Sequence, residues 1–530
     1  RQAIGLKRDF AEAHLNLGNA LHLKGQPEDA IASYRRALRL VPDSAETHYN
    51  LGRVYEAQGK LEDAVRSYRR AVALRPDYTE AHFNLGNVLQ AANRTAEALA
   101  SYQRTLELQP DHADACNNLG AQYELTGRPE QGIASYRRAL ALRPGFPEAH
   151  NNLGNALLAQ GQSDDAIASY QAAIAARPDY AEAHNNLGNA LQAAGRLDDA
   201  IGSHDRALAL NHDLVDARWN KAFALLLAGD YPAGWRLFEA RWELLGNRAD
   251  AQARTRPLWL GAVPLAGRTL LVHHEQGLGD TLQMLRYVPL LATQGARVLV
   301  QVPAALAGLA ATVPGIAGVI LAGEPVPAHD LQCPMMSLPL ACGTTLATVP
   351  ADVPYLSVPA ATGAAWRKRL GPRGLPRARP RAGLVWSGST AHRNDRQRSV
   401  PLAQLLPLLD LPWEFHSLQK EYRAGEVDLL AANRVLRDWS ATLETLADTA
   451  GLIAQLDLVI AVDTAVAHLA GALAKPVWLL LPAAPDYRWL LQRADSPWYP
   501  TMRLFRQPAA GDWSGVISAV SNALGALTRQ

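Results

Sequence analysis

The segment HHEQGLGDTLQ, residues 273–283, follows the apolar run TLLV and places two histidines, a glutamate, two glycines and an aspartate within a few residues. Such a set could ligate a metal, surround a phosphate or supply an acid or base. His273 and His274 are adjacent and would point apart on a strand, and the HxH and HExxH spacings of zinc sites are absent. GLGD also lacks the third glycine of a dinucleotide loop. Asp280 lies at the start of the predicted helix, where an aspartate is most often an N-terminal cap.

A second polar segment, VWSGSTAHRNDRQRS, covers residues 385–399. Hydroxyls and glycine backbone amides are typical phosphate ligands, and arginines add positive charge. The candidates for binding a phosphorylated ligand here are Ser387, Gly388, Ser389, Arg396 and Arg398.

A third segment, AVDTAVAHLAGALAKP, covers residues 461–476. Asp463 and Thr464 are predicted at a helix N-terminus, with His468 one turn further along. The alternative is an ordinary capped helix whose histidine faces the core.

All three segments follow short apolar runs that are predicted as strands. The runs are 269–274, 297–303, 318–322, 382–386, 414–419, 457–462 and 476–481, with Ala/Leu-rich helical stretches between them. Buried strands that alternate with helices predict doubly wound parallel sheets, and such sheets bind ligands beyond the carboxyl ends of their strands. A basic Pro/Gly-rich stretch at 366–381 divides this region and is interpreted as a solvated linker between two sheets.

The first half of the chain repeats every 34 residues. Each copy predicts two amphipathic helices, with small residues where the helices approach. Five copies have a tyrosine four positions after the small residue and a proline at the end, and the last copy has Phe238 at the tyrosine position. This pattern resembles the tetratricopeptide repeat, with seven copies over residues 11–245. Residues 1–10 align with the end of a copy, so we expect them to be the tail of a further repeat upstream.

Asparagine occupies the same position in every copy, although asparagine is a mediocre helix former. The ladder consists of Asn16, Asn50, Asn84, Asn118, Asn152, Asn186 and Asn220. On the first helix of each unit, these carboxamides would line the concave side and offer donors and acceptors to a peptide backbone. The alternative is a shared asparagine inherited by recent duplication. Histidines that recur at the same spacing are too far apart for a shared metal, and we expect them to be structural or to line the groove.

Composition excludes several classes of protein. The chain has 530 residues with 52 basic and 50 acidic side chains, which gives no argument for nucleic-acid or membrane binding. Its three cysteines match neither a zinc spacing nor a disulfide framework, which is typical of a reducing compartment, so we expect a cytoplasmic protein. No apolar run is long enough to predict a membrane span.

Taken together, the three polar segments resemble the heptosyltransferase-like group of glycosyltransferases with the GT-B fold, over residues 269–510. The resemblance rests on Gly279–Asp280 with Pro289 in the first half, and on Asp463, Thr464, His468 and Gly471 in the second. It implies that Asp280 is the general base, that the loop with Gln276, Gly277 and Gly279 receives the acceptor, and that Asp463, Thr464 and His468 contact a nucleotide-sugar. Residues 246–530 contain no D-x-D motif, so arginines and helix N-termini would have to stabilise the leaving phosphate, and no metal or other cofactor is expected.

The expected architecture is an α-solenoid followed by two Rossmann-like domains that face a cleft. Its segments are the repeats (11–245), a linker (246–268), an acceptor-side domain (269–360), a basic linker (361–380) and a nucleotide-sugar domain with a C-terminal helix (381–530). In the first hypothesis the repeats hold a protein, for which flagellin is one candidate by resemblance, and the chain glycosylates its Ser or Thr hydroxyls by an inverting reaction. The alternatives are a glycan or lipopolysaccharide transferase whose repeats recruit partners or self-associate, and a repeat scaffold with a degenerate transferase domain.

Overall fold

The computed structural model describes residues 10–244, 256–371, 379–389, 395–432 and 435–527. The upstream tail expected over residues 1–10, apart from Phe10, lies outside the described residues, as do parts of both expected linkers. The side chain of Arg396 is also outside them.

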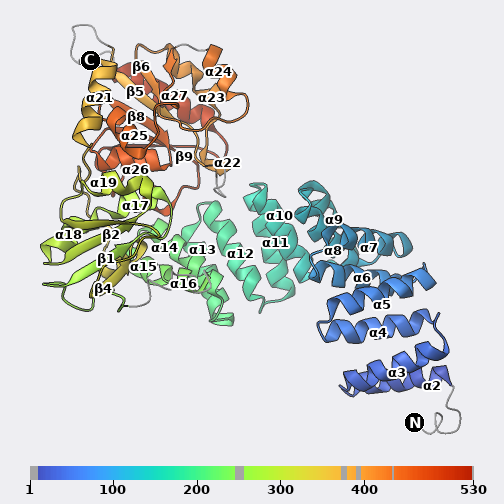
Figure 1. Cartoon of the computed structure of the whole chain (residues 1–530). Helices are drawn as coiled ribbons and strands as arrows, with labels where there is room; N and C mark the ends of the chain where they lie inside the picture. Colours follow the sequence, from blue (N-terminus) through green and yellow to red (C-terminus); the bar gives the residue numbers. More distant parts are fainter. Residues whose placement is uncertain (1–9, 245–255, 372–378, 390–394, 433–434, 528–530) are drawn as a thin grey trace. The chain divides into compact units, whose positions relative to one another are not determined.

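The repeat region consists of seven pairs of helices (Figure 1). The pairs are α2 (Ala11–Leu23) with α3 (Pro27–Leu40), α4 (Ala45–Ala57) with α5 (Leu61–Leu74), α6 (Thr79–Ala91) with α7 (Thr95–Leu108), α8 (Ala113–Leu125) with α9 (Pro129–Leu142), α10 (Pro147–Ala159) with α11 (Ser163–Ala176), α12 (Ala181–Ala193) with α13 (Leu197–Leu210), and α14 (Val215–Ala228) with α15 (Tyr231–Phe238). The predicted α-solenoid of paired helices is therefore confirmed, and residues 10–244 contain seven such pairs.

The glycine that recurs on the first helix of a pair is required by close packing against the recurring tyrosine. A Cβ atom at Gly86 would lie 2.6 Å from a ring carbon of Tyr102, and the same clash recurs at Gly18, Gly52, Gly120 and Gly154. Tyr102 is fully buried. The spacing of small residue and aromatic therefore fixes how closely the two helices of each unit approach.

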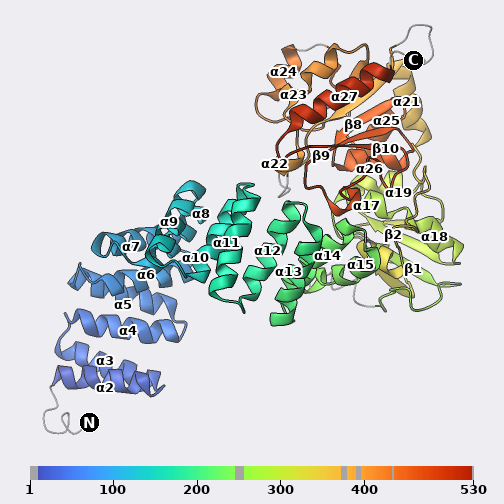
Figure 2. The same cartoon turned by 180° about the vertical axis from the view of Figure 1, so that it is seen from behind.

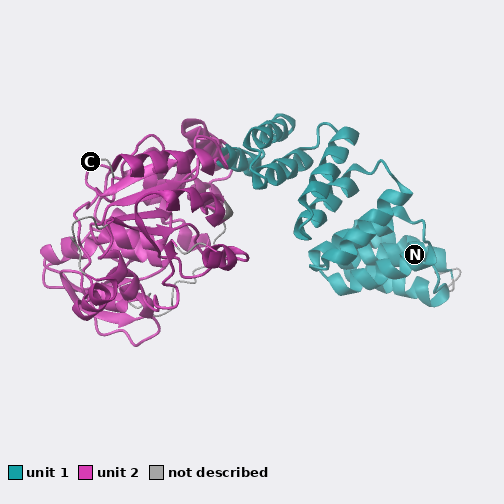
Figure 3. Cartoon of the chain, turned by 90° about the horizontal axis from the view of Figure 1, so that it is seen from above, with its two compact units in different colours: residues 1–190 teal, residues 191–530 magenta. Residues whose placement is uncertain are grey.

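The chain divides into two compact units, residues 1–190 and 191–530 (Figure 3). The predicted boundary at the last repeat, near residue 245, differs from this division. The reason is the aromatic surface of the seventh pair, which packs on the α/β region: Trp235 and Phe238 contact the ring of Tyr487, and Tyr231 stacks on Trp498. The indole of Trp498 also donates a hydrogen bond of 3.1 Å to the hydroxyl of Tyr231.

The α/β part of the second unit contains two sheets whose named strands all pair in parallel. The first sheet has the order β3 (Ile316–Leu321), β2 (Arg297–Val302), β1 (Thr269–His273), β4 (Leu331–Pro334). The second has the order β10 (Met502–Arg506), β9 (Val477–Leu481), β8 (Leu458–Val462), β5 (Arg381–Val385), β6 (Glu414–Ser417), β7 (Leu436–Arg437). All seven expected strands form, while β4, β7 and β10 were missed. The predicted α/β class with parallel sheets is confirmed.

Helices cover both faces of the second sheet. The C-terminal helix α27 (Trp513–Leu527) lies across one face, as Figure 2 shows, and buries Val516 and Val520 with Leu384 and Ile460. Helices α25 (Leu446–Ile453) and α26 (Ala465–Ala472) bury their apolar residues with the opposite set of strand side chains, such as Val459 and Leu479.

Shorter helices complete the second unit. They are α16 (Arg241–Leu244), α17 (Leu278–Met284), α18 (Tyr287–Thr293), α19 (Ala304–Ala310), α20 (Leu338–Ala341), α21 (Ala360–Leu370), α22 (Asp395–Arg398), α23 (Leu402–Leu405) and α24 (Glu426–Ala432), with 3-10 turns η2 (Met335–Ser337), η3 (Leu406–Asp410) and η4 (Tyr487–Trp489).

Both expected linkers contain ordered structure. Residues 361–370 of the basic linker belong to α21, because Trp366 is buried and lies against Gly451 of α25, where an added Cβ would clash with its ring. In the first linker, Trp259 is buried, and its backbone donates to Gln332 of β4 at 2.8 Å. The sequence prediction was wrong at these two places because it weighed Pro, Gly and charge and missed single tryptophans that anchor the chain.

Candidate functional site

In the second sheet the order of strand addition reverses between β5 and β8. After β5 the chain adds β6 and β7 on one side, and after β8 it adds β9 and β10 on the other side. A crevice at such a point, beyond the carboxyl ends of the strands, is the usual ligand site of a doubly wound sheet. Ser387 and Gly388 follow β5, and Asp463 and Thr464 follow β8. The structure therefore brings together two of the three segments that the sequence singled out.

Arg398 joins these two strand ends. Its Nη1 donates a hydrogen bond of 3.0 Å to the backbone carbonyl of Asp463. Gly388 lies against the same guanidinium, since a Cβ there would be 2.4 Å from Nη2 of Arg398. The glycine therefore makes room for a charged side chain of the protein itself. Ser387 is buried, and its backbone is held by Gln419, whereas Ser389 is exposed.

Two polar atoms at this crevice have no hydrogen-bond partner in the structure. They are Oγ1 of Thr464 and Nε of Arg398, and both atoms are buried. Thr464 is the N-cap residue of α26, and its side chain makes no capping bond. A helix N-terminus with an unpaired hydroxyl and an arginine beside it is suited to hold an anion such as a phosphate oxygen.

The carboxylate of Asp463 is held inside the protein. Nε1 of Trp489 donates to it at 2.9 Å, and Nε2 of His468 lies 3.7 Å from its other oxygen. Burial by itself raises the pKa of Asp463, but hydrogen bonding and charge from His468, together with Arg488 and Trp489, outweigh burial and lower the pKa to about 2. His468 is in turn bonded through Nδ1 to the hydroxyl of Tyr499 at 2.9 Å. Asp463 is therefore an ionised, tightly positioned group.

Asp280 lies on α17, close to the same cluster. One oxygen accepts the backbone N–H of Gly277 at 2.9 Å, which is the capping contact offered as an alternative for this residue. The other oxygen accepts a hydrogen bond from Arg488. Arg488 also donates to Asp486 at 2.7 Å and to Gln283 at 2.5 Å. Arg488 thus bonds directly to Asp280, and its charge also lowers the pKa of Asp463.

Asp486 completes the charge cluster. Burial raises the pKa of Asp486 above its ordinary value, with the neighbouring guanidinium of Arg488 acting in the opposite direction. Sequence reasoning missed Arg488 and Asp486, although both lie in PDYRWLL, a stretch whose charged and aromatic residues directly follow a strand. The sequence signal that could have indicated them is an arginine flanked by an aspartate and aromatic residues shortly after β9.

Gly277 and Gly279 belong to the loop that the family resemblance assigns to the acceptor. Neither Gly277 nor Gly279 has a positive φ angle, so the turn does not require glycine for its backbone conformation. Gly279 instead allows α17 to approach α26, since a Cβ there would lie 3.0 Å from Cδ2 of His468. Gln276 is half-buried.

The other polar residues of this loop serve the structure. Glu275, expected only to line a cleft, forms a two-pronged ion pair with Arg241 of the repeat region, with contacts of 2.9 and 3.0 Å. The backbone of Met336 also donates to Glu275 at 2.8 Å. His274 bonds through Nδ1 to Thr281 at 2.8 Å, and burial lowers its pKa, against the opposing charge of Asp280.

In the repeats, four residues of the asparagine ladder donate side-chain hydrogen bonds to neighbouring side chains. Asn152 and Asn186 donate to Asn117 and Asn151 of the preceding repeat, both at 3.0 Å. Asn84 donates to Tyr49 at 3.2 Å. The residue at the equivalent position for Asn118 is Phe83, which cannot accept a hydrogen bond. Asn118 therefore donates to Asn87 at 3.0 Å instead. The ladder therefore links successive repeats by hydrogen bonds. The amino groups of these four residues are engaged, and the oxygen of Asn118 also accepts from Asn117 at 3.2 Å.

The recurring histidines have a structural role, as expected. Nε2 of His48, His82, His150 and His184 lies 2.8–3.2 Å from the carbonyl of the proline that ends the preceding repeat. Burial lowers the pKa of His48 and His82. Where Cys116 replaces the histidine, Arg138 donates to the carbonyl of Pro110 instead.

The described residues contain no group of three or more His, Cys, Asp or Glu side chains that could hold a metal ion. No helix in the described part of the chain combines the length and apolar character that a membrane crossing requires.

Comparison with known proteins identifies the repeats in the N-terminal part of the chain. Families described as TPR repeat or tetratricopeptide repeat match residues 18–59, 52–93, 83–147, 135–168, 154–195 and 183–217. The N-terminal part of the chain consists of tetratricopeptide repeats. This confirms the resemblance inferred from the 34-residue period and indicates a protein-interaction scaffold.

Protein FlbA of Caulobacter vibrioides is 30% identical over 155 residues, which are 27% of this chain and 25% of FlbA. The match thus spans a quarter of the length of that relative. Similar solved structures include MamA, with 28% identity over 31% of this chain and 96% of its own, and a TM-score of 0.30. Pseudomonas aeruginosa pilF shows 20% identity over 40% of this chain and 96% of its own, with a TM-score of 0.36.

Proposed function

We propose that the chain is a metal-independent glycosyltransferase that moves a sugar from a nucleotide-sugar to a Ser or Thr hydroxyl of a polypeptide bound by the repeats. The observation that carries this proposal is that Arg488 pairs with Asp280, which follows the first sheet, and also lowers the pKa of Asp463, which follows the second sheet and lies beside His468. Charged groups of this kind, beside an unpaired Thr464 hydroxyl, are typical of a functional site.

The reaction uses the groups as follows. The acceptor hydroxyl oxygen attacks the anomeric carbon of the donor, and its proton passes to the carboxylate of Asp280. The bond between the anomeric carbon and the phosphate oxygen breaks, and the nucleoside diphosphate leaves with the electron pair. A carboxylate offers about four lone-pair sites, and two of those on Asp280 are used, by Gly277 and Arg488. The guanidinium of Arg398 and the start of α26 would stabilise the leaving diphosphate.

The tetratricopeptide repeats support a protein acceptor, because such repeats are interaction scaffolds. The oxygens of the asparagine ladder can accept N–H groups of an extended backbone regardless of its side chains. Flagellin is a candidate acceptor by the layout of the chain, and a glycan acceptor with protein partners recruited by the repeats is the alternative.

One observation favours a second candidate function, a repeat scaffold whose α/β part does not catalyse transfer. Arg488 already occupies one oxygen of Asp280, and the Gly277 amide occupies the other. Such an arrangement is also what a purely structural ion pair between the two sheets would require, and a substrate hydroxyl must compete with Arg488 for the carboxylate.

Intact-mass measurement of a co-expressed acceptor protein separates these candidates. Asp280→Asn should lower the amount of transferred sugar by about 10²- to 10⁴-fold, because a general base contributes about that much. Asp495→Asn is the matched control, since it removes an exposed carboxylate paired only with Arg493 in the same unit. Transfer by Asp280→Asn at the rate of the control would exclude Asp280 as the base, and absence of transfer by the wild-type chain for every acceptor and donor would favour the scaffold.

A further inference from the structure

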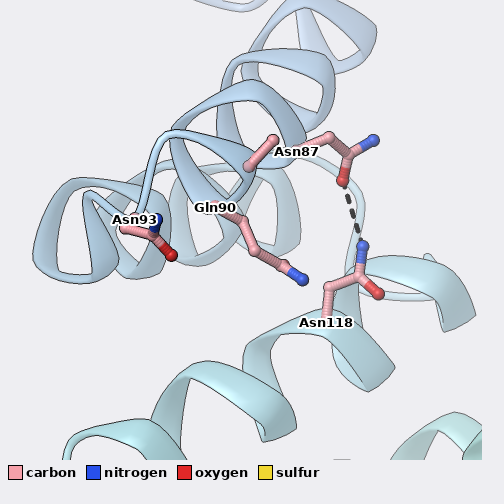
Figure 4. A pocket seen from close by; sticks show the side chains of 5 residues that line it. Asn87, Gln90, Asn93 and Asn118 are labelled. Atoms are coloured by element: carbon pink, nitrogen blue, oxygen red, sulfur yellow. Dashed lines mark hydrogen bonds between the residues drawn. The ribbon is translucent and has the colours of Figure 1, made fainter. Parts of the chain in front are cut away.

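A cavity of about 510 Å³ lies between the third and fourth repeats, as Figure 4 shows. Its polar lining consists of Asn87 and Gln90 on α6, Asn93 in the turn after α6, and Asn118 on α8. Ala91 is the remaining lining residue. All four polar side chains are carboxamides, and none of the lining residues carries a charge.

This combination of residues occurs at a single place among the seven copies. Asn93 occupies a turn position with a φ of 57°, which is held by glycine in every other copy: Gly25, Gly59, Gly127, Gly161, Gly195 and Gly229. An asparagine in this conformation is less favourable than glycine. The sixth repeat has the same set, with Asn189, Gln192 and Asn220, except that Gly195 replaces the asparagine. Asn93 is therefore an addition that the repeat fold does not need.

The internal hydrogen bonds determine which atoms remain for a ligand. The oxygen of Asn87 accepts from Asn118 at 3.0 Å and from the hydroxyl of Tyr102 at 2.9 Å. In Figure 4 the amino group of Asn87 points away from Asn118. The oxygen of Gln90 also lies 2.9 Å from the Tyr102 hydroxyl. A hydroxyl has one proton to donate, so when Asn87 receives it, Gln90 can turn either its oxygen or its amino group toward the cavity.

We propose that this cavity recognises an uncharged carboxamide side chain, glutamine or asparagine, of a polypeptide held by the repeats. A carboxamide presents a carbonyl acceptor and two N–H donors. These can pair with the amino group of Asn87, with the carboxamides of Gln90 and Asn93, and with the second lone pair of the Asn118 oxygen, whose first accepts from Asn117 at 3.2 Å. A carboxylate has no donor for the lining oxygens and brings a charge that no lining residue balances, and an aliphatic side chain leaves the amides unpaired. The inference rests on the proposed binding of a polypeptide by the repeats, and it adds a preference for one type of side chain.

The test is fluorescence anisotropy of the full chain with short, labelled Gly/Ser/Ala peptides that carry a central Gln, Glu or Leu. The Gln peptide should bind about tenfold more tightly than the Glu and Leu peptides, since unpaired polar groups in such a site cost about one decade of affinity. Asn93→Gly and Gln90→Ala should remove most of this preference while the Leu peptide binds as before. The fold tolerates Asn93→Gly, because every other copy carries glycine there.

The outcomes separate this inference from the function proposed above. Equal binding of the three peptides to the wild-type chain, or an unchanged preference in both variants, refutes the cavity as a carboxamide site and leaves the repeats as a polypeptide-binding surface. Failure of every peptide to bind refutes both the carboxamide site and the binding of a polypeptide by the repeats. Neither result depends on sugar transfer, which Asp280→Asn tests independently.

Discussion

The buried ion pair between Arg241 and Glu275 joins the last repeat to the α/β region, and we expect its loss to destabilise the second unit. Arg241 is 2% exposed and Glu275 8% exposed. The guanidinium donates to both oxygens of Glu275, to Glu239 at 2.5 Å and to Ser337 at 2.7 Å. Replacement of Arg241 by Met keeps much of the side-chain volume but leaves the two glutamates without their counter-charge.

The expected cost follows from that burial. Removal of one partner of a buried ion pair costs about 3–5 kcal/mol, because the remaining charge stays desolvated and unpaired. Arg218→Met is the matched control in the same repeat. Arg218 pairs with Glu243, which is 53% exposed, and an exposed pair of this kind contributes at most about 1 kcal/mol.

The destabilisation should depend on pH. Burial raises the pKa of Glu275 above its ordinary value, and Arg241 opposes this effect. Without Arg241 the pKa of Glu275 rises further. A carboxyl whose pKa is higher in the folded state favours folding when protonated, and stability is lost as pH increases from the unfolded pKa through the folded pKa. Arg241→Met should therefore be less destabilising near pH 4.5 than at pH 7.5.

Tryptophan fluorescence during urea unfolding is the appropriate assay. All 12 tryptophans lie at or after Trp219, so the signal reports the second unit and not residues 1–190. The double variant Arg241→Met with Glu275→Gln should recover part of the lost stability, since it removes the unpaired charge at Glu275. A loss below about 1 kcal/mol, equal to that of the Arg218 control, or a loss independent of pH, would refute the assigned role of the ion pair.

Two further substitutions test the packing of the site and the role of the ladder. Gly279→Ala should destabilise the second unit by about 1–3 kcal/mol and reduce sugar transfer, because the added Cβ would lie 3.0 Å from His468. The control is Gly308→Ala, which has open space around it and should be neutral or stabilising in the same fluorescence assay. Asn152→Ala should destabilise the first unit by about 1 kcal/mol through the lost bond to Asn117, measured by circular dichroism, and an unchanged unfolding curve would argue against a structural part for the ladder.

Local patterns were sufficient to predict the elements of the fold. The 34-residue period predicts the helix pairs because each pair repeats the same close contact of a glycine with a tyrosine ring. The apolar runs predict seven strands, and the signal is strongest where a strand is buried on both faces, as in β8 and β9. The two-residue strand β7, paired with β6 alone, gives no comparable signal in the sequence.

The candidate site was predicted less completely, for a physical reason. Asp280, Asp463 and His468 each stand at the start of a helix after a strand, which is a local signal. The aspartate and aromatics beside Arg488 mark the stretch, but they do not reveal its partners, because Asp280 and Gln283 lie more than two hundred positions earlier. Long-range ion pairs of this kind follow from tertiary packing and cannot be read from spacing.

The contacts of residues 273–283 show that this segment has a structural role in addition to the proposed catalytic one. Glu275 anchors the last repeat through Arg241, Gly279 admits His468 of the other sheet, and Asp280 pairs with Arg488. Tyr487, next to Arg488, packs on Trp235 and Phe238 of the seventh repeat. The same short loop is therefore bound on one side to the repeat and on the other to the second sheet. The seventh repeat is then a structural part of the candidate site, and a substitution at Trp235 should disturb Asp280 through Tyr487 and Arg488 without touching any substrate.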